Sequence, residues 1–454
     1  MPMETVNPAS GEKLASFDAW DEGALDEALQ AVAVATPAWQ AMPFEDRAAL
    51  MRAAAADLRS NAKRYAGMIT LEMGKIAKEA SGEIDKCAWV CEYYADNAAA
   101  FLGDEIVETD AARSLVAYLP LGTVLAVMPW NFPFWQVFRF AAPALMAGNT
   151  AVLKHASNVP QCALAIEEVF RKAGFPVGVF RTLMISASQV AGVIEDARIH
   201  AVTLTGSEPA GRKVASTAGG QIKKSVLELG GSDAFVVLAD ADVDDAAATG
   251  VASRYLNAGQ SCIAAKRFIV EESIADRFVS KFKEIAQALK HGDPRSGNTG
   301  IGPLARADLR DELHRQVADS IDAGAVAVLG CAPVEGPGSF YPPSILDRVA
   351  PGMRAYAEEL FGPVAIVIRA RDEDDALCIA NDSRFGLGGS IWTRDRARGE
   401  RLARRMQSGA TFVNGLVKSD PRLPFGGVKA SGYGRELARH GIREFVNVKS
   451  IWIA

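Results

Sequence analysis

A cysteine and a glutamate in small-residue turns are the residues of this chain best suited to chemistry. Cys262 ends the run Asn257-Ala-Gly-Gln-Ser-Cys262, and Glu228 lies 34 residues upstream in Leu227-Glu-Leu-Gly-Gly231. A thiolate is a strong nucleophile, and a carboxylate can take up its proton or activate water against a covalent intermediate. The pair predicts a cleft in which Cys262 is the nucleophile and Glu228 is the base.

Two further motifs could bind groups that take part in such a reaction. Pro129-Trp-Asn-Phe-Pro133 holds Trp130 and Asn131 between two prolines, and a rigid amide can donate a hydrogen bond to an oxyanion. Glu359-Leu-Phe-Gly-Pro363 places a carboxylate two residues from an aromatic ring, which suits a ribose beside a nicotinamide. An ordered loop is the simpler interpretation of either motif taken alone.

Two motifs at predicted strand ends suit a nucleotide. Lys154-His-Ala-Ser157 directly follows a strand, and ligands bind at the carboxyl ends of strands in parallel sheets. Thr205-Gly-Ser207 opens a helix, whose first N–H groups favour a pyrophosphate. A solvated strand end and a plain helix cap are the simpler interpretations when each is taken alone. The GxGxxG pattern typical of dinucleotide sites is missing.

The elements that must position these residues follow from the hydrophobic periodicity. The first hundred residues predict helices, and 114–119 with 123–128 predict a hairpin of two strands around Pro120-Leu-Gly122. From residue 133 helices and strands alternate. The predicted strands are 150–153, 179–185, 200–204, 233–238 and 267–271, and the tail 444–453 is extended. This alternation predicts an α/β fold with parallel sheets, and the Gly-Gly turn near residue 230 marks a domain boundary.

The bulk composition excludes several classes of protein. The chain has 454 residues, enough for two or three lobes, and its net charge of -6 without basic runs argues against nucleic-acid binding. Apolar stretches stop short of the ~18 residues of a membrane span, and the N-terminus lacks a secretory signal. The six cysteines show neither disulfide nor metal-ligand spacing, so we expect no metal and a cytoplasmic location.

A cysteine esterase or hydrolase that needs no cofactor is an alternative use of Cys262. Such an enzyme would place a histidine beside the thiol, and His155 or His440 could fill that role. Glu228 has the better sequence setting. A lone cysteine is also commonly a buried core residue, which leaves a binding or structural protein as a third class.

Taken together, the motifs resemble those of the aldehyde dehydrogenase superfamily over about residues 5 to 454. The motifs occur in the family's order and close to its spacing: Asn131, Lys154, Gly206-Ser207, Glu228, Cys262, Glu359-Leu-Phe361 and Pro424-Phe-Gly-Gly427. The resemblance implies a Rossmann-like cofactor domain without GxGxxG over 1–102 and 120–230, and an α/β catalytic domain over 231–439. It further implies a β oligomerisation flap over 103–119 and 440–454, and a homodimer or homotetramer.

The resemblance also implies the role of each catalytic residue. Cys262 would attack the aldehyde carbon, and the oxyanion would lie between the Asn131 amide and the Cys262 N–H. Loss of a hydride to the nicotinamide would leave a thioester, which water activated by Glu228 would hydrolyse. Glu436 matches a family acid credited with proton relay.

The cofactor residues follow from the same resemblance. Glu359, Phe361 and Trp130 would lie at the nicotinamide riboside, and Lys154 with Ser157 at the adenosine ribose. Gly206 and Ser207 would cap the pyrophosphate. Relatives restricted to NAD often place Glu at position 157, and Ser157 removes its repulsion of a 2′-phosphate. NADP or NAD is therefore expected, with the preference undecided.

Position 139 indicates the substrate, because a guanidinium there could bind a carboxylate. Arg139 resembles the arginine of succinate semialdehyde dehydrogenases, although Arg paired with a structural acid is the alternative. The subgroup's second carboxylate-binding arginine is replaced by Leu256, and Ser419 could substitute for it. Ala264 replaces the subgroup's regulatory thiol. Glutarate semialdehyde and neutral aldehydes are the competing substrates.

Overall fold

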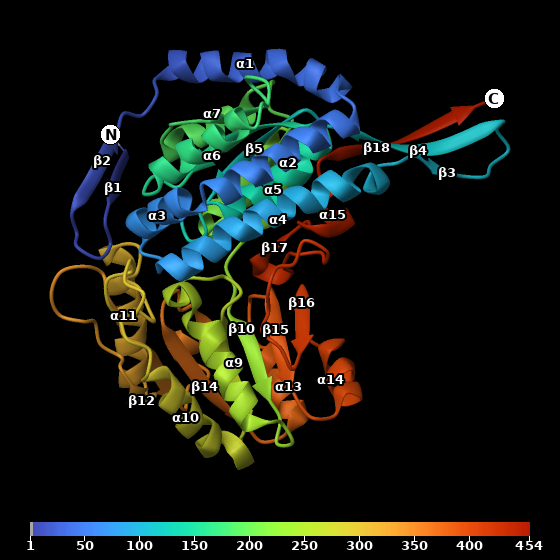
Figure 1. The fold of residues 1–454 in the computed structure, drawn as a ribbon. Coiled ribbons are helices and arrows are strands. Elements are labelled where there is room, and N and C mark those ends of the chain that lie inside the picture. Colours follow the sequence, from blue (N-terminus) through green and yellow to red (C-terminus); the bar gives the residue numbers. More distant parts are fainter. Residues whose placement is uncertain (1–2) are drawn as a thin grey trace.

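Two largely parallel sheets with helices packed on them organise the chain (Figure 1). The computed structural model describes residues 3–454. In order across the first sheet, its strands are β17 (Gly432–Tyr433), β9 (Lys224–Glu228), β8 (Ala201–Thr205), β5 (Thr123–Met128), β6 (Thr150–His155) and β7 (Phe180–Thr182). The second sheet consists of β12 (Val326–Leu329), β13 (Ser344–Asp347), β14 (Val364–Ala370), β11 (Ala265–Glu271), β10 (Asp233–Val237), β15 (Gly388–Trp392) and β16 (Ala410–Val413). The edge strands β17 and β12 are antiparallel to their neighbours.

The six-stranded sheet buries both of its faces. Val124 and Ala126 of β5 face one core, whereas Leu125 between them faces another, as the two-residue period of a strand requires. The first core is filled by α2 (Phe44–Ser60), α3 (Ala62–Met73), α4 (Ala77–Phe101), α5 (Trp135–Met146) and α6 (Pro160–Lys172). The second is filled mainly by α1 (Glu22–Ala41), α7 (Val190–Glu195) and α8 (Glu208–Gly220).

The seven-stranded sheet has its own core, in which aromatic rings from strands and helices meet. Phe235 of β10 lies 5.1 Å from Phe268 of β11, and Phe268 contacts Phe282 at 4.8 Å between ring centroids. Its helices are α9 (Val243–Tyr255), α10 (Glu272–Ala286), α11 (Ala307–Asp322), α12 (Arg354–Ala357), α13 (Glu373–Asn381) and α14 (Arg396–Ala403). Across residues 3–454, none of the helices has the length and apolar character needed to cross a membrane.

A three-stranded antiparallel arm projects from the body and carries the C-terminus (Figure 1). Its strands are β18 (Val446–Ile453), β4 (Arg113–Pro120) and β3 (Glu105–Ile106). The register pairs Val446 with Pro120 and Ile453 with Arg113. The predicted extended tail therefore pairs with the segment of the expected flap. The remaining short elements are β1 (Met3–Val6), β2 (Lys13–Phe17), η1 (Ala187–Gln189), η2 (Leu256–Gly259), η3 (Lys429–Ser431) and α15 (Ala438–Ile442).

Two predictions from periodicity were wrong. The strands on either side of Gly122 form no hairpin, because β4 belongs to the arm while β5 pairs in parallel with β6 and β8. Gly122 has φ +130, and a Cβ there would lie 2.5 Å from the His200 ring, so this glycine permits a close approach between segments. The first hundred residues are also not all helical, since β1 and β2 form a hairpin at their start.

The order of strands places a switch point at β5. The chain runs from β5 to β6 and β7 on one side, then returns to β8 and β9 on the other. Parallel sheets bind ligands in the crevice that forms at the carboxyl ends of such strands. Trp130 and Asn131 follow β5, and Gly206 and Ser207 follow β8, so these predicted site residues share that crevice.

Candidate active site

The loop that carries Cys262 is held in an uncommon backbone conformation. Asn257 and Ala258 have φ values of 54° and 52°, a left-handed conformation that costs a non-glycine residue on the order of 1 kcal/mol. Hydrogen bonds offset that cost. The Asn257 N–H donates to Glu79 at 2.9 Å, and the Asn257 amide donates to the Asn131 carbonyl at 2.8 Å and the Gln260 carbonyl at 3.1 Å. Glu79 comes from α4, so a helix of the first core fixes the loop.

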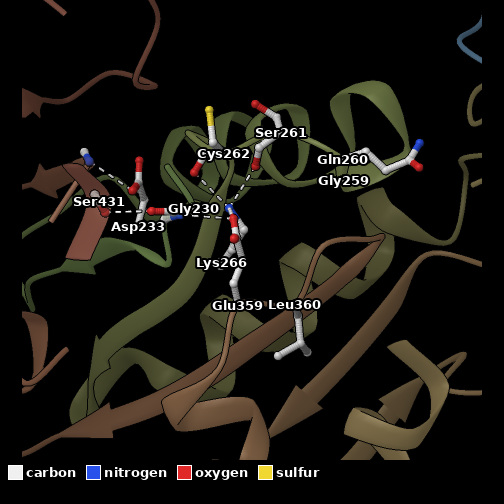
Figure 2. Close-up of polar contacts among 12 residues, drawn as sticks. Gly230, Asp233, Gly259, Gln260, Ser261, Cys262, Lys266, Glu359, Leu360 and Ser431 are labelled. Atoms are coloured by element: carbon white, nitrogen blue, oxygen red, sulfur yellow. Dashed lines mark hydrogen bonds and ion pairs between the residues drawn. The ribbon is translucent and has the colours of Figure 1, made fainter. Parts of the chain in front are cut away.

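A buried lysine holds the loop from its other side. The Lys266 Nζ donates to the carbonyl oxygens of Ser261 at 2.8 Å and of Cys262 at 2.9 Å, and it pairs with Glu359 at 3.2 Å. Figure 2 shows these contacts converging on the lysine, while the Cys262 sulfur points away from it. Glu359 also accepts from the Gly231 N–H at 3.1 Å. With the carbonyls fixed toward Lys266, the sulfur lies on the opposite side of the loop.

Two N–H groups near the sulfur suit an oxyanion. Within residues 3–454 the backbone N–H of Cys262 donates to no acceptor. Asn131 is 4% exposed, and its amide donates one hydrogen bond, to the Gln260 carbonyl at 3.1 Å. That bond orients the amide, and its second N–H hydrogen could still donate to an oxyanion. Asn131 therefore contacts the loop that carries Cys262, and the oxyanion site itself stays a prediction.

Cys262 opens onto a cavity of about 290 Å³ between the two sheets' domains. Its walls are largely apolar and include the rings of Phe132, Trp135 and Phe425. Its charged lining residues are Lys86, Arg139 and Lys418, together with the acids Glu79 and Glu83. No histidine from residues 3–454 lines it. His155 instead contacts the Pro133 carbonyl through Nε2 at 2.9 Å and is buried. The cysteine–histidine arrangement of a hydrolase is therefore not assembled here.

The thiol is surrounded closely enough to be neutral in the free protein. Desolvation raises the pKa of Cys262 to about 12, although the side chain keeps a partly exposed surface toward the cavity. The positive charges of Arg139 and Lys266 act in the opposite direction. Both cations would stabilise the thiolate once the proton has left.

Glu228 ends β9 and does not line the cavity onto which Cys262 opens, so its predicted role as the base stays a prediction. It is 2% exposed, neither carboxylate oxygen has a hydrogen-bond partner within residues 3–454, and it is not among the cavity's lining residues. A Cβ at Gly426 (φ +152) would lie 2.7 Å from the Glu228 Oε1, so the absence of a side chain at Gly426 makes room for the Glu228 carboxylate. Burial, and then the charge of Glu436, raise the pKa of Glu228 well above its usual range.

Arg139 lines the cavity but is already partnered. It lies on α5 and is 1% exposed, its Nε forms an ion pair with Glu436, and its Nη2 donates to Thr205 at 3.3 Å. The guanidinium also lies 4.5 Å from the centroid of the Phe425 ring. Arg139 is therefore paired with an acid, which was the alternative interpretation from the sequence. The same side chain also lines the cavity.

Sequence reasoning missed Lys86, which contacts the predicted residue Ser419. The Lys86 Nζ donates to the Ser419 Oγ at 2.7 Å and lies 4.2 Å from the centroid of the Trp135 ring. The missed signal was a polar stripe on one face of α4, in which Glu79, Glu83 and Lys86 follow helical spacing.

The predicted cofactor residues lie in two places. Lys154 is the next-to-last residue of β6 and lines a cavity of about 180 Å³ between the sheet and helices α7 and α8, together with Lys213. Ser157 is exposed beside this strand end, and Ser207 is the N-cap of α8 without a side-chain capping bond. Gly206 precedes it and donates its N–H to the Glu228 carbonyl at 3.0 Å.

The nicotinamide end would lie near Cys262. Trp130 and Phe361 meet edge to face, with ring centroids 5.8 Å apart, and Glu359 reaches the Cys262 loop through Lys266. The apolar walls and two unpaired lysines of the smaller cavity fit an adenosine carrying phosphate, because no acidic side chain from residues 3–454 lines it. The residues present therefore fit a nicotinamide dinucleotide.

Two α/β units around a nucleophilic cysteine, with a dinucleotide crevice beside it, define a thiol-dependent, nicotinamide-dependent oxidoreductase. The aldehyde dehydrogenase family model matches residues 1–451, and the chain belongs to this family. It is 51% identical over 454 residues to a probable succinate-semialdehyde dehydrogenase (NADP+) from Synechocystis sp., covering 100% of both chains.

Two further relatives agree with this assignment. The chain is 51% identical over 457 residues to succinate-semialdehyde dehydrogenase (NADP+) 1 from Mycobacterium ulcerans, again covering 100% of both chains. Among solved structures, succinic semialdehyde dehydrogenase from Streptococcus pyogenes in complex with NADP+ matches with a TM-score of 0.97 and 39% identity over 99% of each chain. The protein is accordingly an NAD(P)-dependent aldehyde dehydrogenase.

Proposed function

We propose that this enzyme oxidises succinate semialdehyde to succinate with NADP. The observation that carries the proposal is the cavity at Cys262, which combines apolar walls with the cationic side chains Arg139 and Lys86. A neutral aldehyde gains nothing from those charges, whereas a carboxylate at the far end of the substrate does. The names of the relatives from Synechocystis sp. and Mycobacterium ulcerans support the same substrate and cofactor.

The chemistry begins at the sulfur. Cys262 Sγ forms a bond to the aldehyde carbon, and the thiol proton leaves for water. The new oxyanion accepts hydrogen bonds from the Asn131 amide and the Cys262 N–H. When bound, NADP supplies the acceptor for the hydride that the substrate carbon loses, which leaves a thioester on Cys262.

Glu228 then acts as the base for hydrolysis. Its carboxyl group must rotate from its buried position beside Gly426 into the cavity, where contact with water restores an ordinary pKa. There it takes a proton from water, whose oxygen attacks the thioester carbon, and the C–S bond breaks to release succinate.

The cofactor preference rests on charge. Lys154 and Lys213 line the adenosine cavity, and position 157 is a serine, so no acid there repels a 2′-phosphate. Two cations near one phosphate favour NADP over NAD. Glu359, Phe361 and Trp130 would hold the nicotinamide riboside, and the N–H groups at the N-terminus of α8, at Gly206 and Ser207, would bind the pyrophosphate.

The domain division and assembly are part of the proposal. We assign the cofactor domain to 1–102 and 120–230, of which residues 1–2 lie outside the described residues, the catalytic domain to 231–439, and the flap to 103–119 and 440–454. Strand β17 joins the first sheet although it falls inside the range 231–439. The arm's exposed edge supports a homodimer or homotetramer, and six unpaired cysteines support a cytoplasmic location.

A substrate panel tests the proposal. Formation of reduced cofactor should be measured with succinate semialdehyde, glutarate semialdehyde and butyraldehyde, each with NADP and NAD. The proposal predicts that kcat/KM is highest for succinate semialdehyde with NADP. Equal kcat/KM for butyraldehyde would remove the carboxylate from recognition, and a preference for NAD would overturn the cofactor assignment.

A further inference from the structure

The substrate carboxylate needs a second cation, because Arg139 already shares its charge with Glu436. The neutral Leu256 stands where relatives of this substrate class carry a second arginine, and it lines the same cavity. Ser419 alone offers a hydroxyl without charge. The cavity must therefore supply a positive charge from elsewhere if it is to bind the anion tightly.

Lys86 is a cation without a counter-ion. Its ammonium is held by the Ser419 hydroxyl at 2.7 Å and by the Trp135 ring at 4.2 Å, and it forms no ion pair within residues 3–454. Two acids act on Lys86 through their charges, and both are committed elsewhere. Glu83 pairs with Lys75 and accepts the N–H groups of Phe134 and Trp135 at 2.9 and 3.0 Å, and Asp420 pairs with Arg422 at 2.7 Å.

We infer that Lys86 is the second cationic anchor of the substrate carboxylate, positioned by Ser419 and Trp135 so that the anion is bound between Lys86 and Arg139. The inference rests on the proposed function and adds a residue on α4 to the specificity of the site. Ser419 then acts mainly as the acceptor that orients the lysine. Three donors of an ammonium allow Lys86 to keep that bond while it binds the substrate.

The electrostatics of the empty cavity agree with this geometry. Desolvation, and then the charge of Arg139, lower the pKa of Lys86 to about 8. Two cations that repel each other across a cavity are stabilised by an anion placed between them. Lys418 is the matched comparison, because it borders the same cavity but is exposed to solvent.

The test compares Lys86→Met, Lys86→Arg and Lys418→Met. For Lys86→Met, the KM for succinate semialdehyde should rise at least about 10-fold, while kinetic constants for butyraldehyde change less than about 2-fold. Lys86→Arg should retain most of the affinity, and Lys418→Met should raise this KM much less than Lys86→Met does. Unchanged NADP binding and melting temperature establish that each variant is folded.

A second measurement keeps the inference separable from the proposed activity. Succinate should protect Cys262 from alkylation by iodoacetamide at neutral pH, and Lys86→Met should raise the concentration needed at least about 10-fold. The role of Lys86 would be overturned if succinate failed to protect the wild type, or if it protected Lys86→Met as well as the wild type. The same holds if Lys418→Met lost as much protection as Lys86→Met. A wild type that is protected by succinate but does not prefer the semialdehyde would contradict only the proposed function.

Discussion

Arg139 connects substrate recognition to the acids behind the nucleophile. It lines the substrate cavity, while its Nε pairs with Glu436, whose charge in turn raises the pKa of Glu228. An arginine in this place cannot be removed without leaving a buried carboxylate unpaired. Its loss therefore has a structural effect in addition to any effect on substrate binding.

A pair of variants separates the two effects. Arg139→Met should lower stability by about 3 kcal/mol, because Glu436 loses its counter-ion in a buried position. The same substitution should raise the KM for succinate semialdehyde, because the carboxylate loses a cation. Combining Arg139→Met with Glu436→Gln should recover at least half of the lost melting temperature without lowering that KM. If the double variant were no more stable than Arg139→Met, the unpaired charge of Glu436 would not be the cause of the lost stability.

The protonation state of the nucleophile is accessible by pH. Because desolvation raises the pKa of Cys262 to about 12, the thiol of the cofactor-free enzyme should be almost entirely neutral near pH 7. Alkylation of Cys262 by iodoacetamide should rise about 10-fold per pH unit from neutral to alkaline pH. A plateau near pH 7 would contradict a raised pKa. The exposed Cys378 should be replaced by serine so that its reaction does not interfere.

At the scale of elements, the loop from Leu256 to Lys266 determines where the sulfur points. Its left-handed residues are fixed by Glu79 on one side, and its carbonyls by Lys266 on the other. The Arg254 side chain, fully buried, adds a hydrogen bond to the Gly259 carbonyl at 2.7 Å. Contacts from three separate segments thus maintain one short loop.

Lys266→Met tests how much the loop depends on its buried cation. The carbonyls of Ser261 and Cys262 would lose their donor, and Glu359 would lose its counter-ion. We expect kcat/KM to fall roughly 30-fold, about 2 kcal/mol of transition-state stabilisation. Glu359→Gln leaves both carbonyl bonds in place and should cost less in kcat. If Glu359→Gln lost as much activity as Lys266→Met, the effect of Lys266 on catalysis would come from its pairing with Glu359 and not from its bonds to the two carbonyls.

Local pattern predicted the elements better than their pairing. The strands after residue 133 and the long helix α4 follow from periodicity, and the positions of Asn131 and Lys154 at strand ends follow from that order. The partners of β4 could not be predicted, because β18 lies over 300 residues away in the sequence and the Pro-Leu-Gly turn resembles a hairpin. Lys86 was missed for the same reason, since its partner Ser419 is on a distant loop.

At the scale of the whole molecule, the arm presents an unpaired strand edge to solvent. β18 is the last strand of its sheet, and Val448 and Trp452 on one of its faces are 60% and 58% exposed. Exposed edges of this kind are ready to pair with another chain, and an apolar face favours the same outcome. Both features support the proposed assembly into a homodimer or homotetramer.

Trp452→Glu should therefore shift the protein toward monomers at micromolar concentration, as measured by light scattering coupled to size exclusion. A buried glutamate would be desolvated without a partner, which costs several kcal/mol per interface. Lys449→Glu changes charge on the opposite face of the same strand and should have a smaller effect. A wild type that is monomeric, or a Trp452→Glu variant of unchanged mass, would contradict the assembly.

In the proposed mechanism the semialdehyde is oxidised while bound covalently to Cys262, and Glu228 is needed only for its release. Glu228→Gln mixed with succinate semialdehyde and NADP should form one reduced cofactor per active site in a burst, without further turnover. Mass spectrometry should find a succinyl group on the peptide that contains Cys262, and Cys262→Ala should give neither signal. Continued turnover at the wild-type rate in Glu228→Gln, or a burst without an adduct on Cys262, would contradict the mechanism.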